Sequence, residues 1–346
     1  MRGLTISAHG GVDRLELRDD LPEPSLGSDS DVRVRVRAAA LNHLDLFVVG
    51  GLPNVRIVPP WIIGSDAMGT IESIGAAVRG LAIGDQVLIN PGLSDRSCEY
   101  CLAGEQPLCP RFSVLGEHVP GTMAELVVVP ATNVLPVAPD TDPVDGAAFT
   151  LSTLTAWRML VSRARVTAGE HVLIWGIGGG VALACLQICK MLGAYVTVTS
   201  SSDEKLARAL ALGADAAVNH RDADVGREIR ARTGKRGVEV VVDSVGEATW
   251  SQSLGALGRR GRLVTCGGTS GPMVTTDVRR LFWNQWSILG STMGNDAEFA
   301  AVVGKFRQGQ LRPVVDGVYA LDDGAAAFER MRSGEQFGKL VVRVAP

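Results

Sequence analysis

The sequence predicts an α/β protein in which a β-rich segment is joined to a doubly wound parallel sheet. Strands and helices alternate regularly from about Ser152 onward, which is typical of parallel sheets. A glycine-rich turn joins the first strand of this region to its helix. The chain up to about Thr150 instead contains short strands separated by Gly and Pro. With 346 residues, the chain is long enough for two such domains.

Composition excludes several classes of function. Lys and Arg number 34, Asp and Glu number 37, and 46% of residues are hydrophobic. This balance is that of a folded globular protein and lacks the basic excess of a nucleic-acid binder. No apolar run is long enough to span a membrane, and Met1–Gly10 lacks the apolar core of a secretory signal. We therefore expect a cytoplasmic protein whose partner is a small molecule.

Residues Asp31–Arg37 form the clearest strand of the first segment. Val32, Val34 and Val36 alternate there with arginines, as in a half-buried strand. Further strands are expected at Gln86–Asn90, Ala124–Val129 and Asn133–Val137.

The parallel sheet is expected to contain six strands, and four helices are expected to connect them. The strands are His171–Trp175, Tyr195–Thr199, Ala216–Val218, Val238–Val242, Arg262–Cys266 and one near Trp286–Leu289. The helices are Val181–Leu192, Asp203–Leu212, Asp224–Thr233 and Ala248–Leu257. The tail adds helices at Asp296–Gln308 and Asp323–Met331 and a strand at Lys339–Val344, which can return to the first segment.

The turn after His171–Trp175 is a candidate nucleotide site. Residues 175–182 read WGIGGGVA, and Gly178, Gly179, Gly180 and Val181 lie between strand and helix. Glycines in that place let a pyrophosphate approach the helix N-terminus. The third glycine of the usual pattern is replaced by Val181, and a glycine-rich turn without a ligand is the alternative.

The end of the second strand favours NADP(H) over NAD(H). An NAD site usually carries a carboxylate here for the ribose 2′-hydroxyl, whereas this chain has Ser200 and Ser201. Their hydroxyls can donate to a 2′-phosphate, and Lys205 and His220 can add charge or stacking. These residues can also serve simply to cap the next helix, with Asp203 as the N-cap.

A cysteine cluster predicts a structural zinc site. Cys98, Cys101 and Cys109 lie within twelve residues, and Asp95 precedes them at the same spacing of three. Zinc in structural sites is bound by four such ligands, and disulfides are rare in the cytoplasm. Three reduced thiols without a metal are the alternative.

Together these segments resemble the medium-chain dehydrogenase/reductase superfamily over essentially the whole chain, and most closely its zinc-type alcohol dehydrogenase-like and NADPH:quinone oxidoreductase-like members. The resemblance is carried by 42–45 (NHLD), 84–87 (GDQV), 95–109, 115–118 (LGEH), 121–125 (GTMAE), 154–157 (LTAW), 178–182, 243–246 (DSVG), 288–292 (ILGST) and 337–339 (FGK). It implies a GroES-like domain at 1–151 and 293–346, with a zinc lobe at 92–112. A Rossmann domain at 152–292 is implied to face it across the active-site cleft.

The resemblance also implies further cofactor-binding residues and an oligomer. The residues are Thr155, Ser244, Val245, Gly267, Gly268, Ser291, Thr292 and Lys339. The apolar strand near Trp286–Leu289, flanked by Phe282 and Trp283, is expected at a sheet edge. We therefore expect a homodimer, which can pair further into a homotetramer.

One departure from the family decides the expected chemistry. The positions that hold the catalytic zinc in alcohol dehydrogenases carry Asn42, Ser65 and Leu151 here, none of which is a good zinc ligand. The first cysteine of the structural lobe is replaced by Asp95, which can still bind zinc through oxygen. We therefore expect a structural zinc and no catalytic metal.

Without a catalytic metal, the sequence favours an NADPH-dependent reductase of quinones or α,β-unsaturated carbonyls. Such substrates need only hydrogen-bond donors and a route for a proton at their oxygen. Asn42 and His43 are the candidate donors, and Asp45 can orient them. In the alternative interpretation, Asn42 and Asp45 have no catalytic role and serve only to hold the backbone of their loop in a turn. An NADP-dependent alcohol dehydrogenase and a nucleotide-binding protein with little catalysis are the competing functions.

Overall fold

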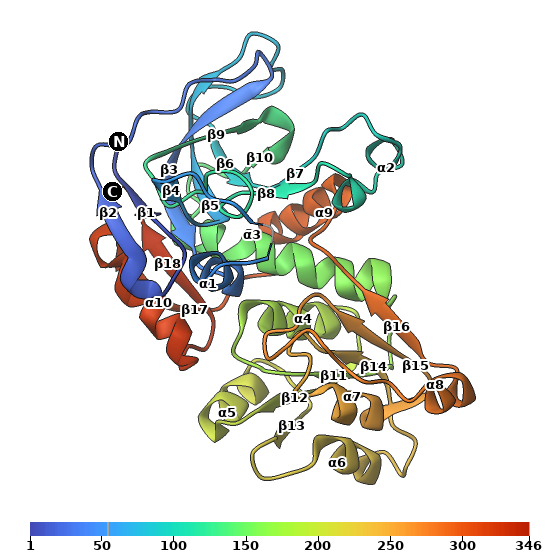
Figure 1. Ribbon diagram of the computed structural model, residues 1–346. Coiled ribbons are helices and arrows are strands. Elements are labelled where there is room, and N and C mark those ends of the chain that lie inside the picture. Colours follow the sequence, from blue (N-terminus) through green and yellow to red (C-terminus); the bar gives the residue numbers. More distant parts are fainter. Residues whose placement is uncertain (54, 346) are drawn as a thin grey trace. The chain divides into compact units, whose positions relative to one another are not determined.

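A seven-stranded sheet forms the centre of the first of two units into which the chain folds (Figure 1). The computed structural model describes residues 1–53 and 55–345. Unit 1 contains Met1–Ser152 and Gly294–Pro346, and unit 2 contains Thr153–Met293. The predicted α/β class, with a β-rich domain and a parallel sheet, is confirmed.

In unit 1 the strands follow the order β10-β6-β5-β3-β18-β17, and β9 also pairs with β3. A smaller sheet has the order β2-β1-β4, and β7 pairs with β8. The strands are β1 (Gly3–Ile6), β2 (Leu15–Arg18), β3 (Asp31–Ala40), β4 (Trp61–Ile62), β5 (Asp66–Ile74), β6 (Gln86–Ile89), β7 (Gly92–Leu93), β8 (Ser113–Val114), β9 (Leu126–Pro130), β10 (Val134–Pro136), β17 (Val315–Ala320) and β18 (Lys339–Arg343). Val32, Val34 and Val36 of β3 are fully buried, as their alternation predicts.

The end of the chain returns to the N-terminal sheet. Strand β18 pairs antiparallel with β3 and parallel with β17. Lys339 is the first residue of β18, so it lies next to the end of β3 at Ala40. Just beyond this end, the Leu41 N–H donates to the Leu340 carbonyl at 2.9 Å, directly before Asn42.

The helices of unit 1 are α1 (His43–Gly50), α2 (Glu99–Leu102), α3 (Pro143–Trp157), which runs on into unit 2, α9 (Asp296–Arg307) and α10 (Gly324–Ser333). Of these helices, α9 and α10 were predicted from the sequence, whereas α1, α2 and α3 were not. Helix α3 is buried on nearly all sides, so its sequence lacks the polar face that marks an amphipathic helix. Its start is nevertheless marked by Pro143 and by Asp142, whose carboxylate accepts the Val144 N–H.

Unit 2 is built on a six-stranded parallel sheet with the order β13-β12-β11-β14-β15-β16 (Figure 1). Its strands are β11 (His171–Ile174), β12 (Tyr195–Ser200), β13 (Ala216–Asn219), β14 (Val238–Val242), β15 (Leu257–Thr265) and β16 (Ser287–Gly290). Its helices are α4 (Gly180–Met191), α5 (Asp203–Ala211), α6 (Val225–Arg232), α7 (Trp250–Ala256) and α8 (Val278–Asn284), and a π-helix covers Arg158–Arg163. Every strand and helix predicted for this region is present. The order reverses between β11 and β14, where doubly wound sheets bind nucleotides.

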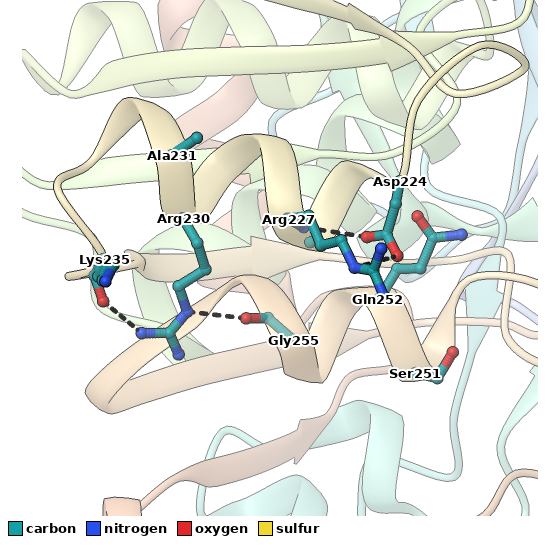
Figure 2. Close-up of a pocket in the computed structure, with 9 residues that line it drawn as sticks. Asp224, Arg227, Arg230, Ala231, Lys235, Ser251, Gln252 and Gly255 are labelled. Atoms are coloured by element: carbon teal, nitrogen blue, oxygen red, sulfur yellow. Dashed lines mark hydrogen bonds and ion pairs between the residues drawn. The ribbon is translucent and has the colours of Figure 1, made fainter.

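A shallow pocket of about 460 Å³ lies between α6 and α7 (Figure 2). Arg230 on its wall donates to the carbonyls of Lys235, Gly255 and Leu257 and so ties α6 to the loop before β14 and to the junction of α7 with β15. Both places lie where a strand begins, so the pocket lies at the amino edge of the sheet. Ligands of doubly wound sheets bind at the opposite, carboxyl edge, and we assign Arg230 a structural role.

Strand β16 lies at the edge of the unit 2 sheet, as predicted. Phe282 and Trp283, on helix α8 just before it, are 63% and 75% exposed, so this edge presents an apolar surface. Among the described residues, no helix has the length and apolar character needed to cross a membrane.

Candidate functional site

Asp66 is the centre of a buried polar network in unit 1. Its Oδ1 atom accepts from Thr150 Oγ1 at 2.5 Å and from the Leu151 N–H at 2.6 Å. Its Oδ2 atom accepts from Asn42 Nδ2 at 2.9 Å and from Lys339 Nζ at 2.8 Å. Asp66 is fully buried and Lys339 is 4% exposed. The carboxylate thus uses four acceptor positions, about its full capacity.

Lys339 also contacts the amide of Asn42. Its Nζ atom donates to Asn42 Oδ1 at 2.6 Å. The sequence analysis assigned Lys339 to the cofactor and Asn42 to the substrate. The structure brings them together at the N-terminus of α1, where Asn42 is the N-cap.

The donor set at this place does not fit a zinc ion. Ser65 is fully buried, and its Oγ donates to the Leu115 carbonyl at 2.7 Å. Leu151 offers only an N–H, and the Asn42 oxygen and Asp66 already accept from Lys339. A metal ion here would lie beside a lysine ammonium, with neither thiolate nor imidazole to hold it.

Asp45 fixes the backbone of the same loop. Its carboxylate accepts the Asn42 N–H at 2.7 Å, which is one half of a capping box. Desolvation raises the pKa of Asp45 to about 7, although the Asn42 N–H and the charge of Lys339 favour the ionised form. This contact agrees with the reading in which Asp45 holds the loop.

His43, the first residue of α1, is solvent-exposed. Desolvation of its ring, and then the positive charge of Lys339, lower its pKa, which favours the neutral imidazole. A neutral imidazole can donate or accept one proton, as expected for a relay.

Most of the predicted cofactor residues of unit 2 gather at the carboxyl edge of its sheet, whereas Thr155 lies on α3 and Lys205 on α5. Each group directly follows a strand. Gly178–Val181 follow β11, Ser200 and Ser201 end β12, His220 follows β13, Ser244 and Val245 follow β14, Gly267 and Gly268 follow β15, and Ser291 and Thr292 follow β16. The two loops after β14 and β15 are joined, since the Thr269 and Ser270 N–H groups donate to the Ser244 and Val245 carbonyls.

Two observations fit a bound dinucleotide at this edge. Gly176 and Gly178 have φ angles of 68° and 128°, which a side chain would strain, and they deliver the chain to the N-terminus of α4. The Ser291 hydroxyl is buried and has no hydrogen-bond partner among the described residues. Buried polar groups are normally paired, so this hydroxyl suits a ligand.

The serine cluster caps the helix that follows β12. Ser202, rather than Asp203, is the N-cap of α5 and accepts the Lys205 N–H at 3.3 Å. Ser200 is buried and Ser201 is exposed. Arg221, which the sequence analysis missed, is exposed directly after His220, whose N–H donates to the Ser200 carbonyl. Its position after β13 is the signal that could have found it.

The four predicted zinc ligands converge in the lobe of unit 1. The ligand atoms of Asp95, Cys98, Cys101 and Cys109 all lie within 4.8 Å of one another. Desolvation raises the pKa of the Cys109 thiol, but the N–H groups of Asp95 and Arg111, which donate to its Sγ, outweigh this and lower the pKa. The set of three sulfurs and one carboxylate fits a structural zinc ion.

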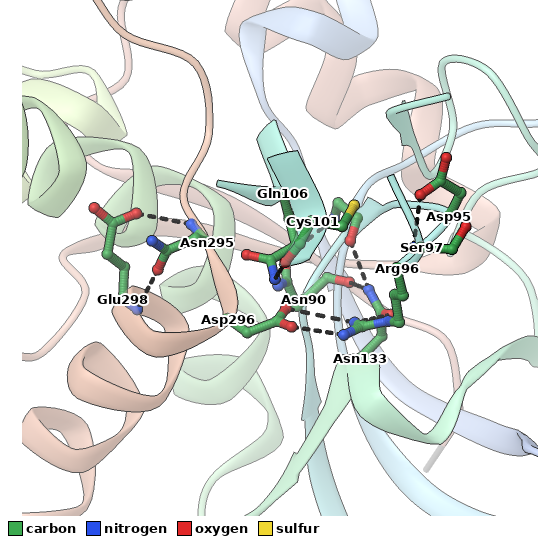
Figure 3. A network of polar contacts seen from close by, with 11 residues as sticks. Asn90, Asp95, Arg96, Ser97, Cys101, Gln106, Asn133, Asn295, Asp296 and Glu298 are labelled. Atoms are coloured by element: carbon green, nitrogen blue, oxygen red, sulfur yellow. Dashed lines mark hydrogen bonds and ion pairs between the residues drawn. The ribbon is translucent and has the colours of Figure 1, made fainter. Parts of the chain in front are cut away.

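The lobe is tied to helix α9 by Arg96, which lies between the ligands (Figure 3). Asp95 accepts the Ser97 and Cys98 N–H groups, which leaves Arg96 in the left-handed conformation at φ 57°. The Arg96 guanidinium donates to Asp296 at 2.6 Å and to the Asn133 amide oxygen at 3.1 Å. The ligand loop is thereby connected to α9 and to Asn133, the residue that precedes β10.

Comparison with known proteins identifies the family. Residues 28–140 match the alcohol dehydrogenase GroES-like domain, and residues 180–308 match the zinc-binding dehydrogenase family. The crystal structure of an NAD-dependent alcohol dehydrogenase is 41% identical, covers 100% of both chains and has a TM-score of 0.95. The chain belongs to the medium-chain dehydrogenase/reductase superfamily.

Relatives within this superfamily differ in activity. An acryloyl-coenzyme A reductase of Sulfurisphaera tokodaii is 29% identical over 94% of this chain and 95% of its own length. A quinone oxidoreductase of Homo sapiens is 28% identical over 99% of this chain and 97% of its own length. The superfamily makes this chain an oxidoreductase of the dehydrogenase or reductase type.

If the lobe binds zinc, chelation should lower the melting temperature by about 5 °C or more, equivalent to roughly 2 kcal/mol. The reason is that the ion cross-links a loop that carries few apolar contacts. Asp95→Cys should retain zinc more strongly, because a thiolate replaces the carboxylate. Calorimetry with metal analysis checks both, with Cys266→Ser, which lies outside the lobe, as control. Zinc-free protein with unchanged stability would contradict the site.

A second prediction concerns Asp45. Because its pKa is raised to about 7, the folded protein retains a proton that the unfolded chain loses near pH 4. The free energy of unfolding should therefore fall by a few kcal/mol as the pH rises from about 4 to about 7. Asp45→Asn keeps an acceptor for the Asn42 N–H and should remove this component. Urea unfolding across this range measures it, and an identical pH dependence in the variant would contradict the assignment.

Proposed function

We propose that this protein is an NADP(H)-dependent reductase that transfers hydride to an α,β-unsaturated carbonyl compound or a quinone without a catalytic metal. The observation that carries the proposal is the Lys339–Asp66 pair with Asn42, where the alcohol dehydrogenases of the family hold zinc. The names of the two reductase relatives support both substrate classes.

The chemistry follows from the groups present. Oxidation of a simple alcohol is favoured by a Lewis-acid metal that stabilises the alkoxide, and the donor set around Asn42 does not fit such an ion. When bound, the nicotinamide supplies the hydride. Charge that develops on a carbonyl or quinone oxygen then needs hydrogen-bond donors, which Asn42 Nδ2 can provide. Neutral His43 can deliver the proton.

The preference for NADP(H) rests on charge at the end of β12. Ser200 and Ser201 replace the usual carboxylate, and Lys205 and Arg221 are the nearby cations of α5 and of the loop after β13. A 2′-phosphate finds hydroxyl donors and positive charge there, and no acid takes the place of Ser200. One zinc ion in the lobe of Asp95, Cys98, Cys101 and Cys109 completes the proposed ligands.

An alcohol dehydrogenase is the second candidate, because the 41% identical structure carries the name NAD-dependent alcohol dehydrogenase. Assays of purified protein with NADPH and an enone, NADPH and a quinone, and NAD(P)⁺ and primary or secondary alcohols separate the two. The proposal expects turnover in the first two assays and little in the third. Fast alcohol oxidation would overturn it.

For the cofactor, NADPH should bind more tightly than NADH by about tenfold or more, or roughly 1.4 kcal/mol. Ser200→Asp should reverse this order, because its carboxylate repels the 2′-phosphate and accepts from the 2′-hydroxyl. Titration of tryptophan fluorescence measures both constants. Equal affinities in the wild type would refute the preference.

For catalysis, Asn42→Ala should lower kcat for an enone by about 10²–10³ while leaving the NADPH dissociation constant unchanged. A quinone accepts hydride more readily and should lose less. Steady-state rates measure the effect. The donor role fails if Asn42→Ala and His43→Ala each keep most of the enone activity.

We also propose that two copies pair along β16, whose edge and neighbouring Phe282 and Trp283 are exposed. Light scattering at micromolar concentration should give a dimer or a tetramer. Trp283→Glu should weaken the association, whereas Met273→Glu, on the loop before α8, is the matched surface control. A monomeric wild type would contradict this pairing.

A further inference from the structure

The side-chain amide of Asn42 has a fixed orientation. An asparagine amide presents an acceptor on one side and a donor on the other, and its neighbours decide which side faces a ligand. Lys339 Nζ, 2.6 Å away, carries only donors, so the atom that faces it must be the amide oxygen. The NH₂ group then faces Asp66 Oδ2 at 2.9 Å with one hydrogen. Its second hydrogen meets no acceptor among the described residues.

Rotation of this amide is strongly opposed. A flipped amide would place its NH₂ against the Lys339 ammonium and its oxygen against the Asp66 carboxylate, replacing two attractive contacts by two repulsive ones. Asp66 cannot turn away, because Thr150 and the Leu151 N–H hold its other oxygen. Asn42, Lys339 and Asp66 are 9%, 4% and 0% exposed, so water screens these contacts little.

The backbone on both sides of the contact is also held. The Asn42 N–H donates to Asp45, and the Leu41 N–H donates to the Leu340 carbonyl. The side chains of Asn42 and Lys339 therefore start from neighbouring, hydrogen-bonded segments of unit 1. This leaves the amide little freedom except rotation, which Lys339 and Asp66 block.

We infer that Lys339 is a positioning residue of the proposed reaction: its buried ammonium holds the Asn42 amide so that only N–H donors are offered to the substrate oxygen. This inference rests on the proposed function. It gives the selectivity a physical basis, since a carbonyl or quinone oxygen can accept from the amide, whereas a ligand that must donate to Asn42 finds its oxygen already occupied.

A double-mutant cycle tests this role. If Lys339 acts through Asn42, Lys339→Met should lower kcat for an enone by a factor close to that of Asn42→Ala, and the double variant should be no slower than Asn42→Ala alone. The NADPH dissociation constant should stay within about twofold. The inference would be overturned if the fold-losses in kcat of the two single variants multiplied in the double variant. It would also be overturned by an unchanged kcat in Lys339→Met or by a loss confined to NADPH affinity.

A second variant separates positioning from folding. Lys339→Met leaves Asp66 without its cation, so the pair Lys339→Met/Asp66→Asn removes both charges together. This double variant should recover the stability lost in Lys339→Met but not its kcat. Recovery of kcat with stability would show a merely structural role. Lys305→Met, which removes an exposed lysine that contacts Gln310, should change neither and is the matched control.

The orientation is also tested without turnover. With ¹⁵N-labelled asparagine, the Asn42 amide should give two sharp NH₂ signals that disappear in Asn42→Ala and shift or broaden in Lys339→Met, because the amide then samples both orientations. Signals that are unchanged in Lys339→Met would refute the inference whatever the activity. A wild type inactive toward both enones and quinones would refute the proposed function, and these signals would still decide the inference.

Discussion

Burial of an ammonium and a carboxylate costs several kcal/mol of desolvation for each ion, and only a close contact with complete hydrogen bonding offsets it. In this protein Lys339 and Asp66 meet that condition at 2.8 Å. The pair draws together the starts of β5, β18 and α1 and the middle of α3, four elements that are distant in sequence. The geometry of the candidate site in unit 1 therefore depends on this one contact.

The same contact distinguishes this protein from the zinc-type members of its family. The resemblance to zinc-type alcohol dehydrogenases implies a divalent cation near position 42, whereas here Lys339 supplies a single positive charge from the chain itself. An ammonium cannot accept an alkoxide as a ligand, but it can hold a neutral donor in place. Under the proposed function, this cation favours substrates whose oxygen only needs to accept hydrogen bonds. The lobe keeps a donor set suited to zinc, whereas the residues around Asn42 do not. The sequence therefore retains the ligands of the structural site but not those of the implied catalytic site.

Much of this could be predicted from sequence. Most strands of unit 2 are short apolar runs with clear turn residues between them, so run length and turn residues were enough to predict them. The lobe ligands were predictable because their spacing is local. Helix α3 was missed because it is buried all round, and α1 because Asn42 and Asp45 were interpreted only as site residues although they also read as a capping box. The partnership of Lys339 with Asp66 and Asn42 was not predictable, since 273 and 297 residues separate the partners and only the pairing of β18 with β3 brings them together.

The central claim is that catalysis uses this buried pair and no metal. Metal content and turnover measured together on the wild type and on a Cys98→Ser/Cys101→Ser variant test it most directly. The account predicts one zinc per wild-type chain and none in the variant. The variant should melt at a lower temperature, but at temperatures where it remains folded its turnover per molecule should equal that of the wild type. A second metal ion per chain, or turnover that disappears with the metal while the fold persists, would contradict it.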